Sequence, residues 1–392
     1  MRFLTCAFSA LMLVNGANAQ PVPCGGNFGD FVADLQAEAE RQGFAPEVAR
    51  SFLSGVRQDP AVLQADQRQG IFQDPFITFS RKLISQSRLD RGRQMADRYN
   101  AIFDEIERRY GISRGVLLAF WAFETDYGAV QGDYNTLNAL VTLAHDCRRP
   151  EIFRPQIFAA LALYARGDFD PATTTGAWAG EIGQVQMLPK DILENGQDAD
   201  GDGRVTLKTS APDALMSGAA MLSDLGWRHG EPWLQEVELP QDFDWYDTGV
   251  HTTKTVAEWE RLGVRARDGR LDDGRLEASI VIPQGRFGPA FIAYPNFRVF
   301  FEWNQSFTYV LTAAYFATRI EGAPVYDAGD PEPGLSGEQM RTLQERLQAR
   351  GYDVGGADGI LGAGTRDAVR EVQRELGLPA DAWPTPDLLN RL

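Results

Sequence analysis

The stretch Leu117-Leu-Ala-Phe-Trp-Ala-Phe-Glu-Thr-Asp-Tyr-Gly128 places one carboxylate, Glu124, at the end of an apolar run. The apolar residues from Val116 to Phe123 would lie on all sides of a helix rather than along one stripe, so they predict a buried helix. Ser113 suits the N-cap of this helix, and Gly128 suits its C-terminal stop. A carboxyl group at the end of such a helix must meet a cation, bind a proton or face a cleft.

Burial would make Glu124 chemically useful. Desolvation raises the pKa of a carboxyl group, and a general acid that works near neutral pH needs a raised pKa. The alternative is a half-exposed glutamate at a helix end, which this stretch alone favours. The remainder of the chain decides between these two interpretations.

The composition excludes some functions. The chain has 392 residues, enough for two or three domains. A hydrophobic content of 44% and a charged content of 23% are typical of soluble globular proteins. The formal net charge of −16 argues against nucleic acid as a partner, because phosphate binding needs a basic surface.

Residues 1–19 have the pattern of a secretory signal peptide. Arg2 supplies the positive charge, an apolar core follows from Phe3 to Val14, and Ala17-Asn-Ala19 is a small-x-small cleavage pattern. The core is too short to span a membrane, and no later apolar run is long enough. We therefore expect export with cleavage after Ala19. The alternatives are a retained anchor and lipidation of Cys6, which lacks small residues just before it.

Cleavage would leave two cysteines, Cys24 and Cys147. In an exported chain, an even pair favours a disulfide, with two unpaired thiols as the alternative. A metal site built on these two distant cysteines is disfavoured, because the chain has only three histidines.

The apolar spacing predicts a mainly α chain with a small inserted β element. A Pro/Gly/acidic linker over 321–334 then precedes a final unit of 335–392. The predicted helices cover 30–56 (with Pro46 in a first turn), 88–110 (stopped by Gly111), the 117–128 stretch, 137–143, 152–164, 213–225 and 307–320, and the predicted strands cover 234–240, 278–283 and 289–301.

Three ordered stretches resemble the lytic murein transglycosylases of the B family. They are Glu124-Thr-Asp-Tyr-Gly128, the glycine-rich Trp178-Ala-Gly-Glu-Ile-Gly-Gln-Val-Gln-Met-Leu-Pro189, and Tyr294-Pro-Asn-Phe-Arg-Val-Phe-Phe-Glu-Trp-Asn-Gln-Ser306. The resemblance covers about residues 30–320 and implies a lysozyme-like α core. It also implies a lyase reaction on peptidoglycan in the periplasm, without a catalytic cofactor.

The family uses one glutamate where ordinary glycosidases use two carboxylates. Glu124 matches this acid/base, and the nucleophile would be the substrate's own C6 hydroxyl, giving 1,6-anhydro-MurNAc ends. The resemblance also implies roles in substrate binding. For Arg148 and Arg149, a solvated pair in a loop is an equal alternative to substrate binding. For Tyr127, the alternative is a packing role. The matching positions are Gln186, Asn304, Tyr309, Tyr127, Arg148 and Arg149.

The chain departs from the family pattern at several positions. Asp126 replaces an asparagine and is expected to be structural or solvated; two residues from Glu124, it would point elsewhere on a helix. Ala177 replaces a serine, Gln184-Val185 replace Tyr-Gly, and Trp303 replaces a tyrosine. These changes bear on substrate contacts more than on the reaction.

The acidic loop over 198–206 matches the first half of an EF-hand loop, with Asp at positions 1, 3 and 5 and Gly at 6. Position 12 is Thr209 rather than glutamate, and Asp213 would have to supply the missing carboxylate. We expect a structural calcium ion, with an acidic turn as the alternative. The candidate ligands are Asp198, Asp200, Asp202, Arg204 and Asp213.

Residues 335–392 resemble the three-helix peptidoglycan-binding domain of wall enzymes. The resemblance rests on Leu343 to Leu347, Gly351-Tyr352, Asp358 to Gly362, and Thr365 as the cap of a helix. We therefore expect a 20–320 catalytic domain joined to a wall-binding domain, with peptidoglycan strands as the partner. A hydrolytic muramidase and a non-catalytic wall-binding scaffold are the alternatives. Wall-synthesis and division proteins are further candidate partners that no motif identifies.

Overall fold

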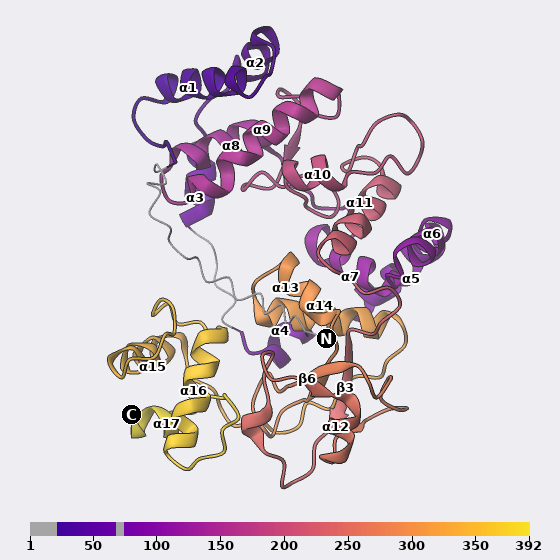
Figure 1. The fold of residues 1–392 in the computed structure, drawn as a ribbon, viewed down its shortest axis with the longest axis vertical. Coiled ribbons are helices and arrows are strands. Elements are labelled where there is room, and N and C mark those ends of the chain that lie inside the picture. Colours follow the sequence, from indigo (N-terminus) through magenta and orange to yellow (C-terminus); the bar gives the residue numbers. More distant parts are fainter. Residues whose placement is uncertain (1–21, 68–73) are drawn as a thin grey trace, which may run out of the picture.

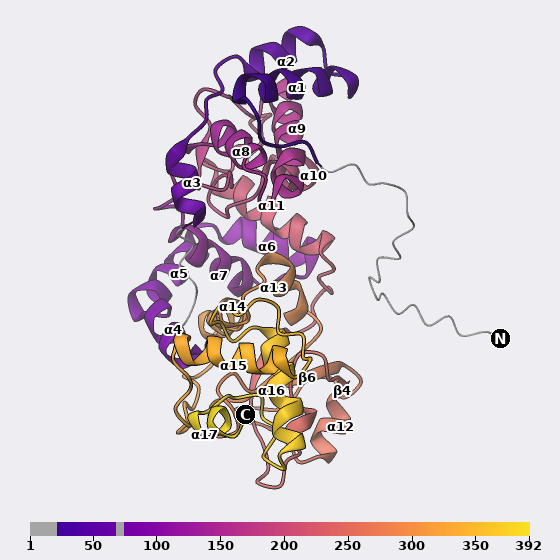
Figure 2. The same cartoon turned by 90° about the vertical axis from the view of Figure 1, so that its left-hand side faces the viewer.

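A computed structural model describes residues 22–67 and 74–392. The predicted signal peptide lies outside these described residues. Within them, none of the helices combines the length and apolar character that a membrane crossing would require. The molecule is elongated, with α1 and α2 at one end and the C-terminal helices beside a β-sheet at the other (Figures 1 and 2).

Helices form the first half of the chain and confirm the mainly α prediction. Pro46 occupies the first turn of its helix, and the short β1–β2 ladder is antiparallel. The elements are α1 (Phe28–Arg41), α2 (Pro46–Leu53), α3 (Pro60–Gln67), α4 (Phe76–Leu83), α5 (Gln86–Arg98), α6 (Asn100–Tyr110), α7 (Arg114–Thr125), β1 (Tyr134–Asn135), α8 (Thr136–His145), α9 (Pro150–Arg166), β2 (Thr175–Gly176), α10 (Pro189–Asn195) and α11 (Ala211–Asp224).

Several helix boundaries differ from the prediction. The single helix expected over 88–110 is wrong, because Tyr99 leaves the helical conformation (φ −110°, ψ 27°) and separates α5 from α6. Helix α7 ends at Thr125 rather than near Gly128, because Asp126 and Tyr127 adopt left-handed conformations (φ 50° and 60°). Asp tolerates this conformation better than most residues, as does the asparagine that the family has at this position.

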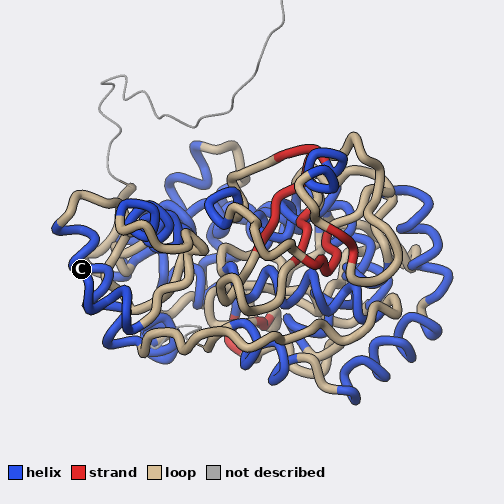
Figure 3. The backbone as a smooth tube through the Cα atoms, turned by 90° about the horizontal axis from the view of Figure 1, so that it is seen from below, coloured by secondary structure: helices blue, strands red, loops and turns tan. Residues whose placement is uncertain are grey.

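A small β element follows α11 and confirms the predicted insertion (Figure 3). Its five strands run in the order β4-β6-β7-β3-β5 with antiparallel pairing. The predicted strand over 289–301 is mostly wrong: β7 is short, and the aromatic residues after Asn296 form α13 instead. The elements are β3 (Leu234–Glu238), η1 (Trp245–Asp247), β4 (Lys254–Thr255), α12 (Val256–Arg261), β5 (Arg265–Ala266), β6 (Glu277–Val281), β7 (Phe291–Ala293), α13 (Phe297–Trp303) and α14 (Phe307–Ile320).

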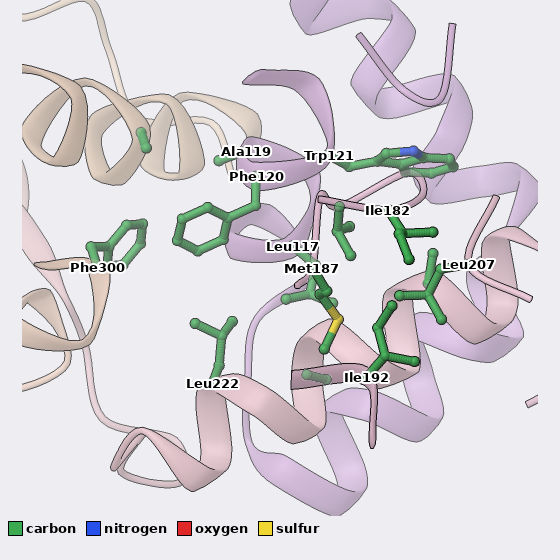
Figure 4. Close-up of a cluster of buried hydrophobic side chains, with 14 of the residues drawn as sticks. Leu117, Ala119, Phe120, Trp121, Ile182, Met187, Ile192, Leu207, Leu222 and Phe300 are labelled. Carbon is green, nitrogen blue, oxygen red and sulfur yellow. The ribbon is translucent and has the colours of Figure 1, made fainter. Parts of the chain in front are cut away.

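Helix α7 lies in the main hydrophobic core, as its all-round apolar pattern predicts. Every residue from Gly115 to Ala122 is buried. Phe120 points toward Phe300 on one side of α7, while Trp121 lies on the other side with Ile182 and Leu207 (Figure 4). The rigid position of α7 fixes the place of the carboxyl group at its end.

A disulfide joins the start of the described chain to the loop after α8. Cys24 and Cys147 are bonded, with Cα atoms 5.2 Å apart. The backbone N–H of Gly25 also donates to the carbonyl of His145 (2.9 Å). The disulfide predicted from the even cysteine pair is therefore present.

The C-terminal unit is a three-helix domain with its own hydrophobic core. It consists of α15 (Gly337–Ala349), α16 (Ala363–Glu375) and α17 (Pro386–Arg391). The preceding linker contains no helix or strand, but Tyr326 within it is buried and bonds Ser80 (2.8 Å). Arg286 of the loop after β6 pairs with buried Asp381 (3.1 Å), which joins the unit to the remainder of the protein.

Candidate active site

The carboxyl group of Glu124 lies at the C-terminal end of α7, between residues of the α13–α14 segment. Its Oε1 accepts a hydrogen bond from Nε1 of Trp303 (3.2 Å) and another from the hydroxyl of Tyr309. Trp303 is held in place by stacking on Phe120 of α7, with ring centroids 4.3 Å apart. Two neutral donors therefore aim at one oxygen of a carboxyl group, and neither is a cation.

This environment holds the carboxyl group of Glu124 in the range of a general acid. Burial raises its pKa from 4.5 to about 7. The hydrogen bonds from Tyr309 and Trp303 oppose this rise, and the nearby carboxylate of Glu181 adds to it. At neutral pH the group therefore populates both the protonated form that donates a proton and the ionised form that accepts one.

The glycine-rich segment closes over the end of α7. The Thr125 hydroxyl donates to the carbonyl of Gln184 (2.6 Å), and Nε1 of Trp121 donates to its side-chain Oε1 (3.1 Å). Gly183 has a positive φ of 81°, and a Cβ there would lie 2.5 Å from the Cβ of Leu207. Glycine is therefore required for the segment to pack this closely.

Gln186 and Asn304 lie in segments that border Glu124. Gln186 adopts a left-handed conformation (φ 54°), and its Nε2 donates to the carbonyl of Gly183 (2.7 Å). Asn304 ends α13, and its Oδ1 accepts from the N–H of Ser306 (2.9 Å). Backbone contacts orient both side chains, and Nε2 of Gln186 also donates to the carbonyl of Gln131 (3.4 Å).

Tyr127 takes the packing role that was its alternative interpretation. It is 5% exposed, and its hydroxyl donates to the backbone carbonyl of Arg88 (2.8 Å). The neighbouring Asp126 pairs with Arg88 (3.3 Å) and Arg91 (3.1 Å), which agrees with the expected structural role. The structure therefore favours the packing role, and the substrate contact of Tyr127 stays a prediction.

Arg148 and Arg149 share one buried carboxylate, that of Asp66. Nη2 of Arg149 lies 2.6 Å from Asp66 Oδ1, and Arg148 pairs with the other oxygen. The Asp66 side chain is 2% exposed, so it needs these cations. The pair therefore anchors α3 to the loop after α8 while both side chains stay partly exposed, and its contact with substrate stays a prediction. No pattern in the sequence indicates this role of Asp66, because its partners are far away along the chain.

Glu181 is a second carboxylate that the sequence analysis passed over. It lies in the glycine-rich segment, and its buried Oε2 has no hydrogen-bond partner among the described residues. Burial raises its pKa, and its charge interacts with those of Glu124 and Arg149. The sequence does contain a sign of this difference, because the resembled family has alanine where this chain has Glu181.

The acidic loop brings three carboxylates together. Asp198, Asp200 and Asp202 offer oxygens that all lie within 4.8 Å of one another. Such a set of oxygen donors fits a hard cation such as calcium. Asp213 is buried, and its carboxylate accepts the N–H groups of Ala199 (2.9 Å), Asp200 and Thr206 (2.9 Å), which orders the loop. Its role as a calcium ligand stays a prediction.

Comparisons with known proteins agree with this geometry. SltB3 from Pseudomonas aeruginosa, solved in complex with NAG-anhNAM-pentapeptide, is 35% identical and superimposes with a TM-score of 0.85, covering 94% of this chain and 99% of that chain. SltB1 from the same organism is 25% identical, with a TM-score of 0.65 over 74% of this chain and 99% of that chain. Membrane-bound lytic murein transglycosylase B of Escherichia coli (strain K12) is 24% identical over 304 residues, 72% of this chain and 82% of that protein.

Two family descriptions account for most of the chain. Residues 336–392 match the peptidoglycan binding domain family. Residues 27–318, well over half of the chain, match the family described as the transglycosylase SLT domain. This chain therefore belongs to the SLT transglycosylase family and carries a peptidoglycan-binding domain at its C-terminal side.

Proposed function

We propose that this chain is a lytic transglycosylase that cleaves the β-1,4 bond between MurNAc and GlcNAc in peptidoglycan and leaves 1,6-anhydro-MurNAc ends. The observation that carries the proposal is the environment of the Glu124 carboxyl group. Burial raises its pKa to about 7, and it accepts hydrogen bonds from Tyr309 and Trp303. The family match and the solved complexes of SltB3 with muropeptides support the choice of substrate.

Glu124 acts in both steps of the proposed reaction. In its protonated form it gives a proton to the glycosidic oxygen as the bond from that oxygen to C1 of MurNAc breaks. The resulting carboxylate then takes the proton of the C6 hydroxyl, and O6 forms the new bond to C1. No water is consumed. The sugar supplies the nucleophile, so one carboxyl group is sufficient.

Gln186 and Asn304 hold the saccharide in this proposal. Each carries a primary amide on a segment that packs near the end of α7, and an amide can both donate to and accept from acetamido and hydroxyl groups. Tyr309 acts on Glu124 rather than on the sugar, because its hydroxyl donates to the carboxylate. It stabilises the ionised form that the second step needs.

Glu181 favours one alternative, a muramidase that transfers the sugar to water. A hydrolysing glycosidase usually has a pair of nearby carboxylates. The Oε2 atom of Glu181 has no hydrogen-bond partner among the described residues, so it is able to accept a proton or a hydrogen bond. The product decides between the two reactions, since an anhydro end lacks one water relative to a hydrolysed end.

The test is mass spectrometry of the material released from purified sacculi. We expect the wild-type protein to release anhydro-muropeptides, and Glu124→Gln to release almost none while it still binds sacculi. Hydrated ends from the wild type would establish the muramidase. If wild type and Glu124→Gln both bound the wall and neither released soluble products, the protein would be a non-catalytic scaffold.

We also propose that the protein works in the periplasm and holds a structural calcium ion. The first 19 residues support export, and the substrate lies outside the cytoplasm. Asp198, Asp200 and Asp202 would hold the ion, and a related lytic transglycosylase, Slt35 from Escherichia coli, has been solved in complex with calcium. Calcium should raise the melting temperature of the wild type and leave that of Asp198→Asn unchanged. An equal response of both proteins would refute the site.

A further inference from the structure

The first turn of α14 carries Tyr309, which donates a hydrogen bond to Glu124, and this turn has little support from its own helix. The N–H groups in the first turn of a helix lack intrahelical partners, and helix ends fray. The Oγ atom of Ser306 caps the turn, but it lies 3.4 Å from the backbone nitrogen of Tyr309, which is long for a hydrogen bond. Side-chain packing against other elements must therefore hold the turn in place.

Phe307, the first residue of α14, supplies this packing. Its ring stacks on that of Phe301 in α13, with centroids 6.3 Å apart. The guanidinium of Arg366 also lies over the ring of Phe307, 4.7 Å from the centroid. Arg366 belongs to α16, so a residue of the peptidoglycan-binding domain covers the start of the helix that carries Tyr309.

The side chain of Arg366 is itself held in place. Its Nη2 donates to the carbonyl of Pro283 (2.9 Å) in the loop after β6, and its Nε is buried. Desolvation lowers the pKa of Arg366 to about 10, as does the charge of Arg370, while the charges of Asp381 and Asp367 oppose this change. The guanidinium therefore stays charged at neutral pH. A desolvated cation is attracted to an aromatic face more strongly than an exposed one, so this contact is firm.

We propose that Arg366 is a positioning residue: through Phe307, it holds the first turn of α14 where the hydroxyl of Tyr309 reaches the catalytic carboxyl group. This inference rests on the proposed function, which gives that carboxyl group its role. The peptidoglycan-binding domain then contributes to the geometry of the active site without touching the substrate.

The protonation of Glu124 reports on this arrangement. Burial raises its pKa to about 7, and the nearby charge of Glu181 adds to the rise. The hydrogen bonds from Tyr309 and Trp303 oppose it. Trp303 has separate support, because it stacks on Phe120 with centroids 4.3 Å apart. A change that moves only the Tyr309 hydroxyl away therefore removes one donor from the carboxylate, and the pKa of Glu124 should rise further.

Arg366→Met tests the proposal, because methionine keeps much of the apolar bulk and removes the cation. We expect the titration midpoint of Glu124 to rise by about half a pH unit or more. NMR of isotope-labelled glutamate side chains measures the midpoint, and Glu124→Gln assigns the signal. The alkaline limit of kcat/KM should rise by the same amount. The matched control is Arg374→Met on the same helix, since Arg374 lies over Tyr246 of η1 instead (4.3 Å), and its midpoint should equal that of the wild type.

Two further variants make the test decisive. Phe307→Leu removes the other partner of the contact and should raise the midpoint in the same way, which decides the question even where Arg366→Met does not fold. In a Tyr309→Phe background, Arg366→Met should add almost nothing, because the hydroxyl that it positions is already gone. The proposal would be overturned by a wild-type midpoint in Arg366→Met or Phe307→Leu, by an equal rise in Arg374→Met, or by a full additional rise in the Tyr309→Phe background.

The titration needs no turnover, so the positioning role and the proposed reaction can fail separately. A raised midpoint in Arg366→Met, together with a wild type that releases no muropeptides, would support the contact and refute the reaction. An unchanged midpoint, together with normal release of anhydro-muropeptides, would refute the positioning role alone.

Discussion

Replacing Glu124 by glutamine should stabilise the protein, and the gain should depend on pH. Burial favours the protonated carboxyl group, so folding raises its pKa from 4.5 to about 7. The stability that this group contributes is fully present below about pH 4.5 and is lost as pH rises to about 7. At about 1.4 kcal/mol for each tenfold change in proton affinity, the loss is about 3 kcal/mol. Glutamine is always neutral, so the variant does not lose this stability as pH rises.

Urea unfolding followed by tryptophan fluorescence measures this effect. We expect the stability difference between Glu124→Gln and wild type to be about 2 to 3 kcal/mol larger at about pH 8 than at about pH 5. Packing changes due to the substitution are the same at both pH values and cancel in the comparison. A difference that did not change with pH, or that shrank at high pH, would show that Glu124 is not a buried acid with a raised pKa.

Three further changes test other parts of the site. Tyr309→Phe removes a donor to the Glu124 carboxylate, so the alkaline limit of kcat/KM should move up by about one pH unit. A limit that did not move would contradict the assignment. The control is Tyr315→Phe, on the same helix, whose hydroxyl accepts a hydrogen bond from the N–H of Tyr326. Glu181→Gln removes a negative charge near Glu124, so the same limit should move down, and a hydrolytic role would instead appear as a loss of hydrated products. The double variant Cys24→Ser/Cys147→Ser should lose about 2 to 5 kcal/mol of unfolding free energy, because the disulfide closes a long loop; stability equal to that of the wild type would refute this.

Local patterns were sufficient for most of the architecture. Residues 307–320 are apolar at helical spacing and form α14 with the predicted bounds, and the run before Glu124 forms the buried α7. The failures occurred where tertiary contacts override local preference. The aromatic residues of 297–303 have strand propensity, but they fold as α13 because this places Phe300 and Trp303 against Phe120.

The sequence by itself predicted the buried helix that ends near Glu124, favoured the disulfide between Cys24 and Cys147, and indicated a small helical domain on the C-terminal side. These features depend on neighbouring residues or on residue counts. Only the tertiary structure decided what surrounds Glu124. Trp303 and Tyr309, which donate hydrogen bonds to its carboxylate, lie 179 and 185 residues away along the chain. Asp66 pairs with Arg148 and Arg149, the two arginines expected to bind substrate. Burial and pairing are properties of the assembled fold rather than of the local sequence.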